Sequence, residues 1–220
     1  MSTEQFEDET PSTPAEMLAL MRDQRRSTRA RMSVVFSRLL IVWAVAWAMG
    51  FFALWSAEAI GGNPAFRIPQ QIAWPVFGVL MVVGIVWSAV TGIRSGRDIR
   101  GRSKLAGMLY GWSWSVSMAG AGFFAAGLQL AGEPGELSAL LYPGLFILLV
   151  GVQYLGGAAL ERSPAMFALG VVMIVTVIVA TWVGSPTHYL LYGTVGPVAM
   201  LVVAALMAAG VLPAAAEDRR

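Results

Sequence analysis

Residues 38–58 read RLLIVWAVAWAMGFFALWSAE, and nineteen uncharged residues separate Arg38 from Glu58. At about 1.5 Å of helical rise per residue, this stretch is close to the thickness of the hydrocarbon core of a bilayer, about 30 Å. The whole chain is 57% apolar and 13% charged, whereas soluble domains are roughly 45–50% apolar and about 25% charged. Length of the uncharged stretch and composition therefore both place the protein in the membrane class.

Six apolar stretches of this kind follow one another along the chain. The last uncharged interval lies between Arg162 and Glu217 and is long enough for two spans, with a break at residues 184–188, Gly-Ser-Pro-Thr-His. The period of two that barrel strands require is absent, which favours helices. We expect an all-α polytopic membrane protein whose six transmembrane helices form one domain, residues 34–213. The spans are predicted near residues 36–57, 73–93, 106–130, 138–160, 164–183 and 189–212.

The N-terminal tail, residues 1–33, differs in composition from the rest of the chain. Thr13, Pro14 and Glu16 form the signature of a helix start, with Thr13 and Glu16 in the positions of a capping box. A short basic helix is expected over about residues 14–32. Two interpretations stay open: a helix lying on the inner leaflet with its arginines over anionic headgroups, or a solvated helical lead-in to the first span. Its basic residues are Arg22, Arg25, Arg26 and Arg29.

The distribution of positive charge predicts the orientation. Of the 15 Lys and Arg residues, all except Arg67 fall on the side of the membrane that holds both chain ends. Lys and Arg accumulate in the cytoplasmic segments of membrane proteins. We therefore expect a multi-pass protein of the plasma membrane whose N-terminal tail and C-terminal tail, residues 214–220, are cytoplasmic.

The loop between the second and third spans concentrates this charge. Each basic residue at a membrane surface is worth about 1 kcal/mol toward anionic lipid, so the loop predicts contact with anionic lipids of the cytoplasmic leaflet, or with a protein partner. The simpler interpretation is that it only sets topology. No nucleic acid partner is expected. The basic residues at this loop are Arg94, Arg97, Arg100, Arg102 and Lys104.

Small and neutral-polar residues stand out inside the spans. In the third span, Gly107, Gly111, Ser115 and Ala119 repeat every four residues, and a second stripe, Ser113, Ser117, Ala121 and Ala125, runs beside them. Small residues let helices approach closely, so we expect this span to be the most tightly packed. Gln129 and Gln153 are the costliest neutral groups to bury, and each needs an internal partner. They suit either helix packing or a transport pathway.

The residues that carry chemistry are scarce. Cysteine is absent, and His188 is the only histidine, so no catalytic residue, cofactor or metal site is predicted. His188 is expected as a loop residue at the outer boundary, with Tyr189 and Tyr192 in an aromatic belt there. Trp47 lies too deep for such a belt and is expected to pack between helices.

Two segments carry a resemblance to a known group of proteins. They are Gly107-Met108-Leu109-Tyr110-Gly111-Trp112-Ser113-Trp114 and Leu149-Val150-Gly151-Val152-Gln153-Tyr154-Leu155-Gly156-Gly157. With the leader that ends in Gln24-Arg25-Arg26 and a Trp-rich first span, the chain resembles a group of uncharacterised six-span membrane proteins from actinobacteria. The resemblance implies the same six-span fold. That group has no assigned activity, so it supplies no site residues.

Three classes of function remain. The first is a non-catalytic membrane module, an accessory, sensor or partner-binding subunit that works by helix packing and a basic cytoplasmic surface, alone or as a homo-oligomer. The alternative is a small transporter or channel for a neutral or apolar solute, since ion coupling usually needs a charge at membrane depth. A membrane enzyme ranks last. Transport predicts polar span residues that converge on one cavity, whereas a packing role predicts that they scatter among helix contacts.

Overall fold

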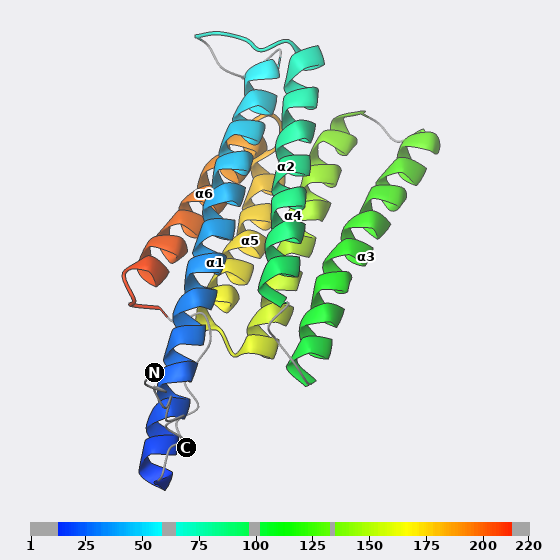
Figure 1. Cartoon of the computed structure of the whole chain (residues 1–220). Helices are drawn as coiled ribbons and strands as arrows, with labels where there is room; N and C mark the ends of the chain where they lie inside the picture. The colour runs from blue at the N-terminus through cyan, green and yellow to red at the C-terminus, as the bar shows by residue number, and fades with distance from the viewer. Residues whose placement is uncertain (1–12, 59–64, 97–101, 133–134, 213–220) are drawn as a thin grey trace, which may run out of the picture.

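The computed structural model describes residues 13–58, 65–96, 102–132 and 135–212, and within these ranges every element of regular secondary structure is an α-helix. Figure 1 shows the helices running side by side, up and down along one direction. Their bounds are α1 Pro14–Ala57, α2 Gln70–Gly96, α3 Arg102–Leu130, α4 Gly135–Glu161, α5 Pro164–Val183 and α6 Thr187–Ala208. The two ends of the bundle are called here the basic end, where α1 enters and α6 ends, and the opposite end.

Five helices in the described chain are long and apolar enough to cross a membrane, namely α2, α4, α5, α6 and the part of α1 from Ala30 onward. Each coincides with one of the expected spans. The 29-residue α3 is not among them, because its glycines, serines and aromatic residues lower its hydropathy. The break expected at residues 184–188 is confirmed: α5 ends at Val183 and α6 begins at Thr187.

The basic helix expected before the first span is part of α1. The capping box is confirmed: the Thr13 side chain accepts from the Glu16 amide, and the Glu16 carboxylate accepts from the Thr13 amide, each at 3.3 Å. From there α1 continues for 44 residues without interruption, since no Gly or Pro occurs between Pro14 and Gly50. Figure 1 shows its first part projecting beyond the bundle. This geometry favours the helical lead-in over a separate helix lying on the leaflet.

The helices pack in the order α2, α1, α6, α5, α4, α3. The most extensive contact joins the first and last helices of the chain, and α5 packs against both α4 and α6. In contrast, the substantial packing of α2 is on α1, and that of α3 is on α4. Four helices therefore surround the core, and two are attached to its sides.

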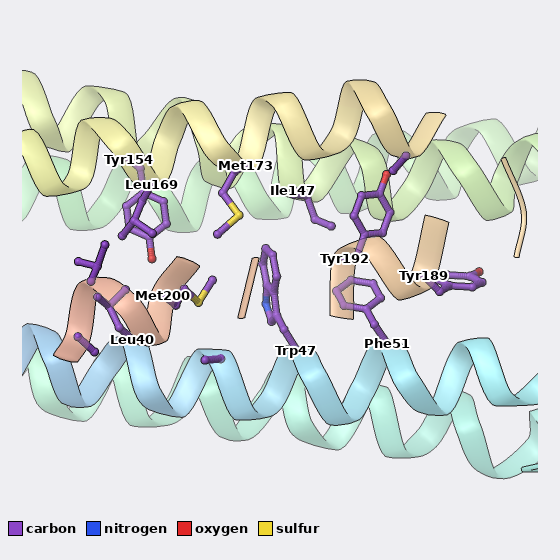
Figure 2. Packing of buried hydrophobic residues seen from close by; sticks show 14 of the residues in the cluster. Leu40, Trp47, Phe51, Ile147, Tyr154, Leu169, Met173, Tyr189, Tyr192 and Met200 are labelled. Atoms are coloured by element: carbon purple, nitrogen blue, oxygen red, sulfur yellow. The ribbon is translucent and has the colours of Figure 1, made fainter. Parts of the chain in front are cut away.

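Large rings of α1 fill the core against glycines of α6. Trp47 is 5% exposed and Phe51 2% exposed, and Figure 2 shows both pointing into the interior of the bundle. A methyl group added at Gly196 would lie 3.2 Å from the Trp47 ring, and one at Gly193 would lie 3.2 Å from the Phe51 Cβ atom. The expectation that Trp47 packs between helices is confirmed. The missing side chain at Gly196 admits the Trp47 ring, and the one at Gly193 admits the Phe51 Cβ atom and the backbone of α1.

A second close approach joins α4 to α5. A methyl group at Gly151 would lie 2.8 Å from Cγ1 of Ile174 and 3.1 Å from the carbonyl oxygen of Gly170, and one at Gly170 would lie 2.8 Å from the carbonyl oxygen of Gly151. The two backbones are thus in direct contact at this crossing, as small residues on facing helices permit.

The expectation that the third span is the most tightly packed is wrong. Nothing lies within 4 Å of a methyl group added at Gly107 or Gly111, and Ser115 is exposed. The stripe of these residues faces away from the bundle because the other stripe of α3 meets α4: Ala121 and Ala125 are 7% and 8% exposed. In the described chain, α3 is the most loosely attached helix.

Two glycine substitutions test this reversal. Gly151→Ala forces its methyl group against Gly170 and Ile174, so we expect it to lower the free energy of unfolding by about 1–3 kcal/mol, as overpacking does. Gly111→Ala meets open space and gains helix propensity, so it should be neutral or stabilising by about 0.5–1 kcal/mol. Thermal unfolding of both purified variants in detergent measures the difference. A Gly111→Ala cost as large as that of Gly151→Ala would restore the original expectation.

Candidate functional sites

A polar cluster joins α3 to α4 around Gln153. The Gln153 amide oxygen accepts from the Ser113 hydroxyl at 3.1 Å, and its amide nitrogen donates to the Ser117 hydroxyl at 2.9 Å. The Tyr110 hydroxyl donates to the backbone carbonyl of Gln153 at 2.8 Å. The expected internal partner of Gln153 is therefore confirmed. The cluster fixes the register of α3 on α4.

Gln129 does not have the internal partner that was expected. It is exposed and lies in the last turn of α3, which ends at Leu130. The side chain makes no hydrogen bond within the described residues. A glutamine at membrane depth needs a hydrogen-bonding partner within the protein. At a helix end, water and lipid headgroups can be that partner, so Gln129 needs none inside the bundle.

The other polar residues of the spans lie apart from this cluster. The Ser88 hydroxyl accepts from the Trp43 indole at 2.9 Å, between α1 and α2. The hydroxyls of Thr176 and Thr181 bond to carbonyls of their own helix, four residues earlier, at 2.7 and 2.9 Å. These residues scatter among helix contacts and do not gather around one cavity.

The aromatic end of α6 is a core feature. His188 is fully buried, and Tyr189 and Tyr192 are each 1% exposed. They lie in the first two turns of α6, at the expected end of the last span, but the expectation of a loop histidine and of belt tyrosines at the membrane surface is wrong. The two tyrosine rings pack against Phe51, with ring centroids 5.4 Å away for Tyr192 and 6.4 Å away for Tyr189, and His188 packs against the two tyrosines. The fold buries them because α1 and α6 are in contact along this face.

His188 anchors α6 to α4 and is not placed for acid–base catalysis. Its Nε2 lies 2.9 Å from the Ala139 carbonyl, and since a carbonyl only accepts, Nε2 carries the hydrogen. Nδ1 is then an acceptor, and it is buried without a partner, as is the Tyr192 hydroxyl. Within the described ranges no three His, Cys, Asp or Glu residues group together to hold a metal ion.

One cleft combines positive charge with hydroxyl groups. It has a volume of about 300 Å³, lies between α1 and α2 at the basic end, and carries Arg38 from α1 and Arg94 from α2. Its other lining residues are Val35, Trp87, Val90, Thr91 and Ser95. Arg94 belongs to the predicted basic set, whereas Arg38 was missed. In the sequence, residues 87, 91 and 95 recur every four positions, so they form one face of α2, and this face ends beside the basic residues that close the span. This pattern was the available sequence signal for the α2 side of the cleft.

The rest of the predicted basic set is described only in part. Arg22 is exposed on the projecting part of α1, and the side chains of Arg25, Arg26 and Arg29 lie outside the description. Arg97 and Arg100 lie outside the described residues. Arg102 and Lys104 belong to the first turn of α3, again without described side chains.

A second cleft is almost wholly apolar. It has a volume of about 330 Å³ and lies between α1 and α6, lined by Ala48, Met49, Phe52, Tyr189, Leu190, Gly193 and Thr194. The Thr194 hydroxyl donates to the Leu190 carbonyl of its own helix at 2.6 Å. Ligand sites combine an apolar lining with a few polar groups that orient the ligand, and this cleft offers little of the second kind.

Fold and sites together define an α-helical membrane protein without a recognisable catalytic centre in its described part. No known protein family, no curated protein and no solved structure matches the chain. The resemblance to uncharacterised six-span actinobacterial proteins stays a prediction. Functional conclusions therefore rest on the chain's own geometry.

The polar cluster can be tested with the two glutamines. Gln153→Leu leaves the Ser113 and Ser117 hydroxyls without their shared partner, so we expect a loss of about 0.6–1.7 kcal/mol, the range of hydrogen bonds between membrane helices. Gln129→Leu should be neutral because its side chain lies at a helix end. Unfolding in detergent compares the two variants. Equal stability of Gln153→Leu and the unchanged protein would show that the cluster does not hold α3.

Proposed function

We propose that the protein is a non-catalytic membrane module that assembles with a partner helix through the outward face of α3. In this proposal all six helices span the membrane, α3 included. Figure 1 supports the sixth span, since α3 runs beside α4 over most of its length. The face consists of Gly107, Gly111, Ser115 and Ala119.

The state of α3 is the observation that carries the proposal. The helix packs substantially on α4 alone, it is not among the five described helices that are long and apolar enough to cross a membrane, and nothing lies within 4 Å of a methyl group added at Gly107 or Gly111. A stripe of this spacing lets a second helix approach closely in a bilayer, where van der Waals packing drives association. A partner helix there would cover the Ser115 hydroxyl and the exposed backbone around the glycines.

The partner that this face fits best is a second copy of the chain. A two-fold interface brings the same patch of both subunits together, and small residues at four-residue spacing are complementary to themselves. No other protein is needed to supply the matching surface.

The basic end is proposed to face the cytoplasm of a cell whose plasma membrane holds the protein. The distribution of Lys and Arg supports this orientation, and the arginines of the projecting part of α1 would then lie beyond the anionic leaflet. The transporter alternative gains no support, since Ser88, Gln153 and Thr176 bond at separate helix contacts and line neither described cleft.

Cysteine cross-linking tests the proposed face, and the chain has no cysteine of its own. Ser115→Cys places a thiol on the outward face, so mild oxidation in native membranes should give a disulfide-linked dimer of the chain. Ser117→Cys is the matched control, because Ser117 lies on the opposite face of α3, where its hydroxyl accepts from the Gln153 amide of α4. It should give no dimer.

The products of this experiment decide between occupants. A covalent adduct of Ser115→Cys with a different protein would support the α3 face as an interface, but its partner would then be that protein and not a second copy of the chain. A monomer with both variants would remove the proposed function.

Reporter fusions test orientation independently. A fusion after Gly132 should report the outside, because residues 131–132 follow the end of α3 opposite the basic end. A fusion at the C-terminus should report the cytoplasm. A cytoplasmic signal at Gly132 would contradict both the sixth span and the charge argument.

A further inference from the structure

We propose that the cleft between α1 and α2 binds the phosphate of an anionic phospholipid, with Arg38 and Arg94 on either side of it. Both arginines line the cleft, and neither has a carboxylate or any other hydrogen-bonding partner within the described residues. Two arginines from different helices thus line one cleft, and neither is paired with a carboxylate of the described residues. Placing like charges together is costly unless an anion joins them.

The hydroxyl groups of the cleft are also free. Thr176, Thr181 and Thr194 each donate to a carbonyl four residues earlier in their helix. Thr91 and Ser95 make no such bond in the described chain, although both line the cleft. Their hydroxyls can therefore donate to an oxygen that enters from outside.

The depth of the cleft matches that of a lipid headgroup. Arg38 precedes Ala57, the end of α1, by nineteen residues, which is about 28 Å of helix. Arg94 follows Trp74 by twenty residues, about 30 Å. These lengths match the hydrocarbon thickness. With Ala57 and Trp74 at one membrane surface, Arg38 and Arg94 would therefore reach the depth of the lipid phosphates at the other.

The remaining lining favours a lipid over a soluble anion. Trp87 is 48% exposed and Val90 41% exposed, so the cleft opens sideways along an apolar surface of α2, where an acyl chain can lie. Guanidinium groups bind phosphate through paired hydrogen bonds, and basic pockets between transmembrane helices bind anionic headgroups. The occupant is thus a phospholipid with a phosphate near the two arginines and a chain along Trp87.

This inference rests on the proposed placement of the basic end at a leaflet surface, and it does not involve the face of α3. The two ideas can therefore fail separately. Loss of lipid binding with an intact Ser115→Cys dimer removes the lipid site alone, and the reverse result removes the α3 face alone.

Native mass spectrometry of the full chain tests the site. The protein is extracted in mild detergent and titrated with phosphatidylglycerol or with phosphatidylcholine. We expect one phosphatidylglycerol to bind at least tenfold more tightly than phosphatidylcholine, and Arg38→Gln with Arg94→Gln to remove this preference. The matched control, Arg22→Gln with Arg31→Gln, deletes two charges from the exposed part of α1 and should retain it. Equal loss in both pairs would mean diffuse charge attraction and would overturn the site.

A second variant keeps the test decisive if the arginine pair misfolds. Thr91→Val with Ser95→Ala leaves every charge in place and should weaken phosphatidylglycerol binding severalfold. Inorganic phosphate is titrated in parallel and should neither bind at millimolar concentration nor displace the lipid. Binding of inorganic phosphate as tight as that of the lipid would assign the cleft to a soluble anion. Unchanged lipid affinity in the hydroxyl variant would also contradict the proposal.

Discussion

The packing of Trp47 and Phe51 over Gly196 and Gly193 is the contact on which the rest of the bundle depends. In a bilayer, lipid tails are as apolar as leucine, so helices associate through close van der Waals fit and a few hydrogen bonds. Here the Trp47 ring fits over Gly196, the backbone of α1 at Phe51 approaches Gly193, and the first and last helices join. Then α5 packs on α6, and α4 meets α5 at Gly151. The core is thus a row of helix contacts that runs from α1 through α6 and α5 to α4.

The remaining two helices, α2 and α3, lie outside this core and expose surfaces that can contact lipids or other helices. α2 packs substantially on α1 and encloses with it the cleft of Arg38 and Arg94, whereas α3 is held to α4 through Gln153 and its hydroxyl partners. Each side helix therefore presents most of its surface outward. The chain concentrates its closest helix packing in the centre, whereas the two side helices carry the unpaired arginines of the cleft and the exposed stripe of α3, which suits a protein that acts by contact with lipids and partner helices.

Helix positions could be predicted from the sequence, because charge clusters and the break at Gly184 delimit the apolar stretches physically. The facing of α3 could not. Its two stripes of small residues are offset by two positions, as at Gly111 and Ser113, which is about 200° around a helix. Both stripes satisfy the spacing rule for close packing. The deciding signal was hydrogen bonding: only Ser113 and Ser117 match the amide of Gln153. The cleft between α1 and α2 could not be predicted from the sequence, because Arg38 comes close to Arg94 only when α2 packs on α1.

The central claim is that the stripe with Gly111 and Ser115 is open in one copy of the chain and covered in the membrane. Single cysteines placed along α3 from residue 107 to residue 125 measure this directly, by their rate of modification with a membrane-permeant maleimide. We expect rapid modification at 107, 111 and 115 in detergent-isolated monomer, slow modification at 117 and 121, and protection of the first group in native membranes. Rapid modification of 117 and 121 beside a protected 111 in the isolated monomer would contradict the account.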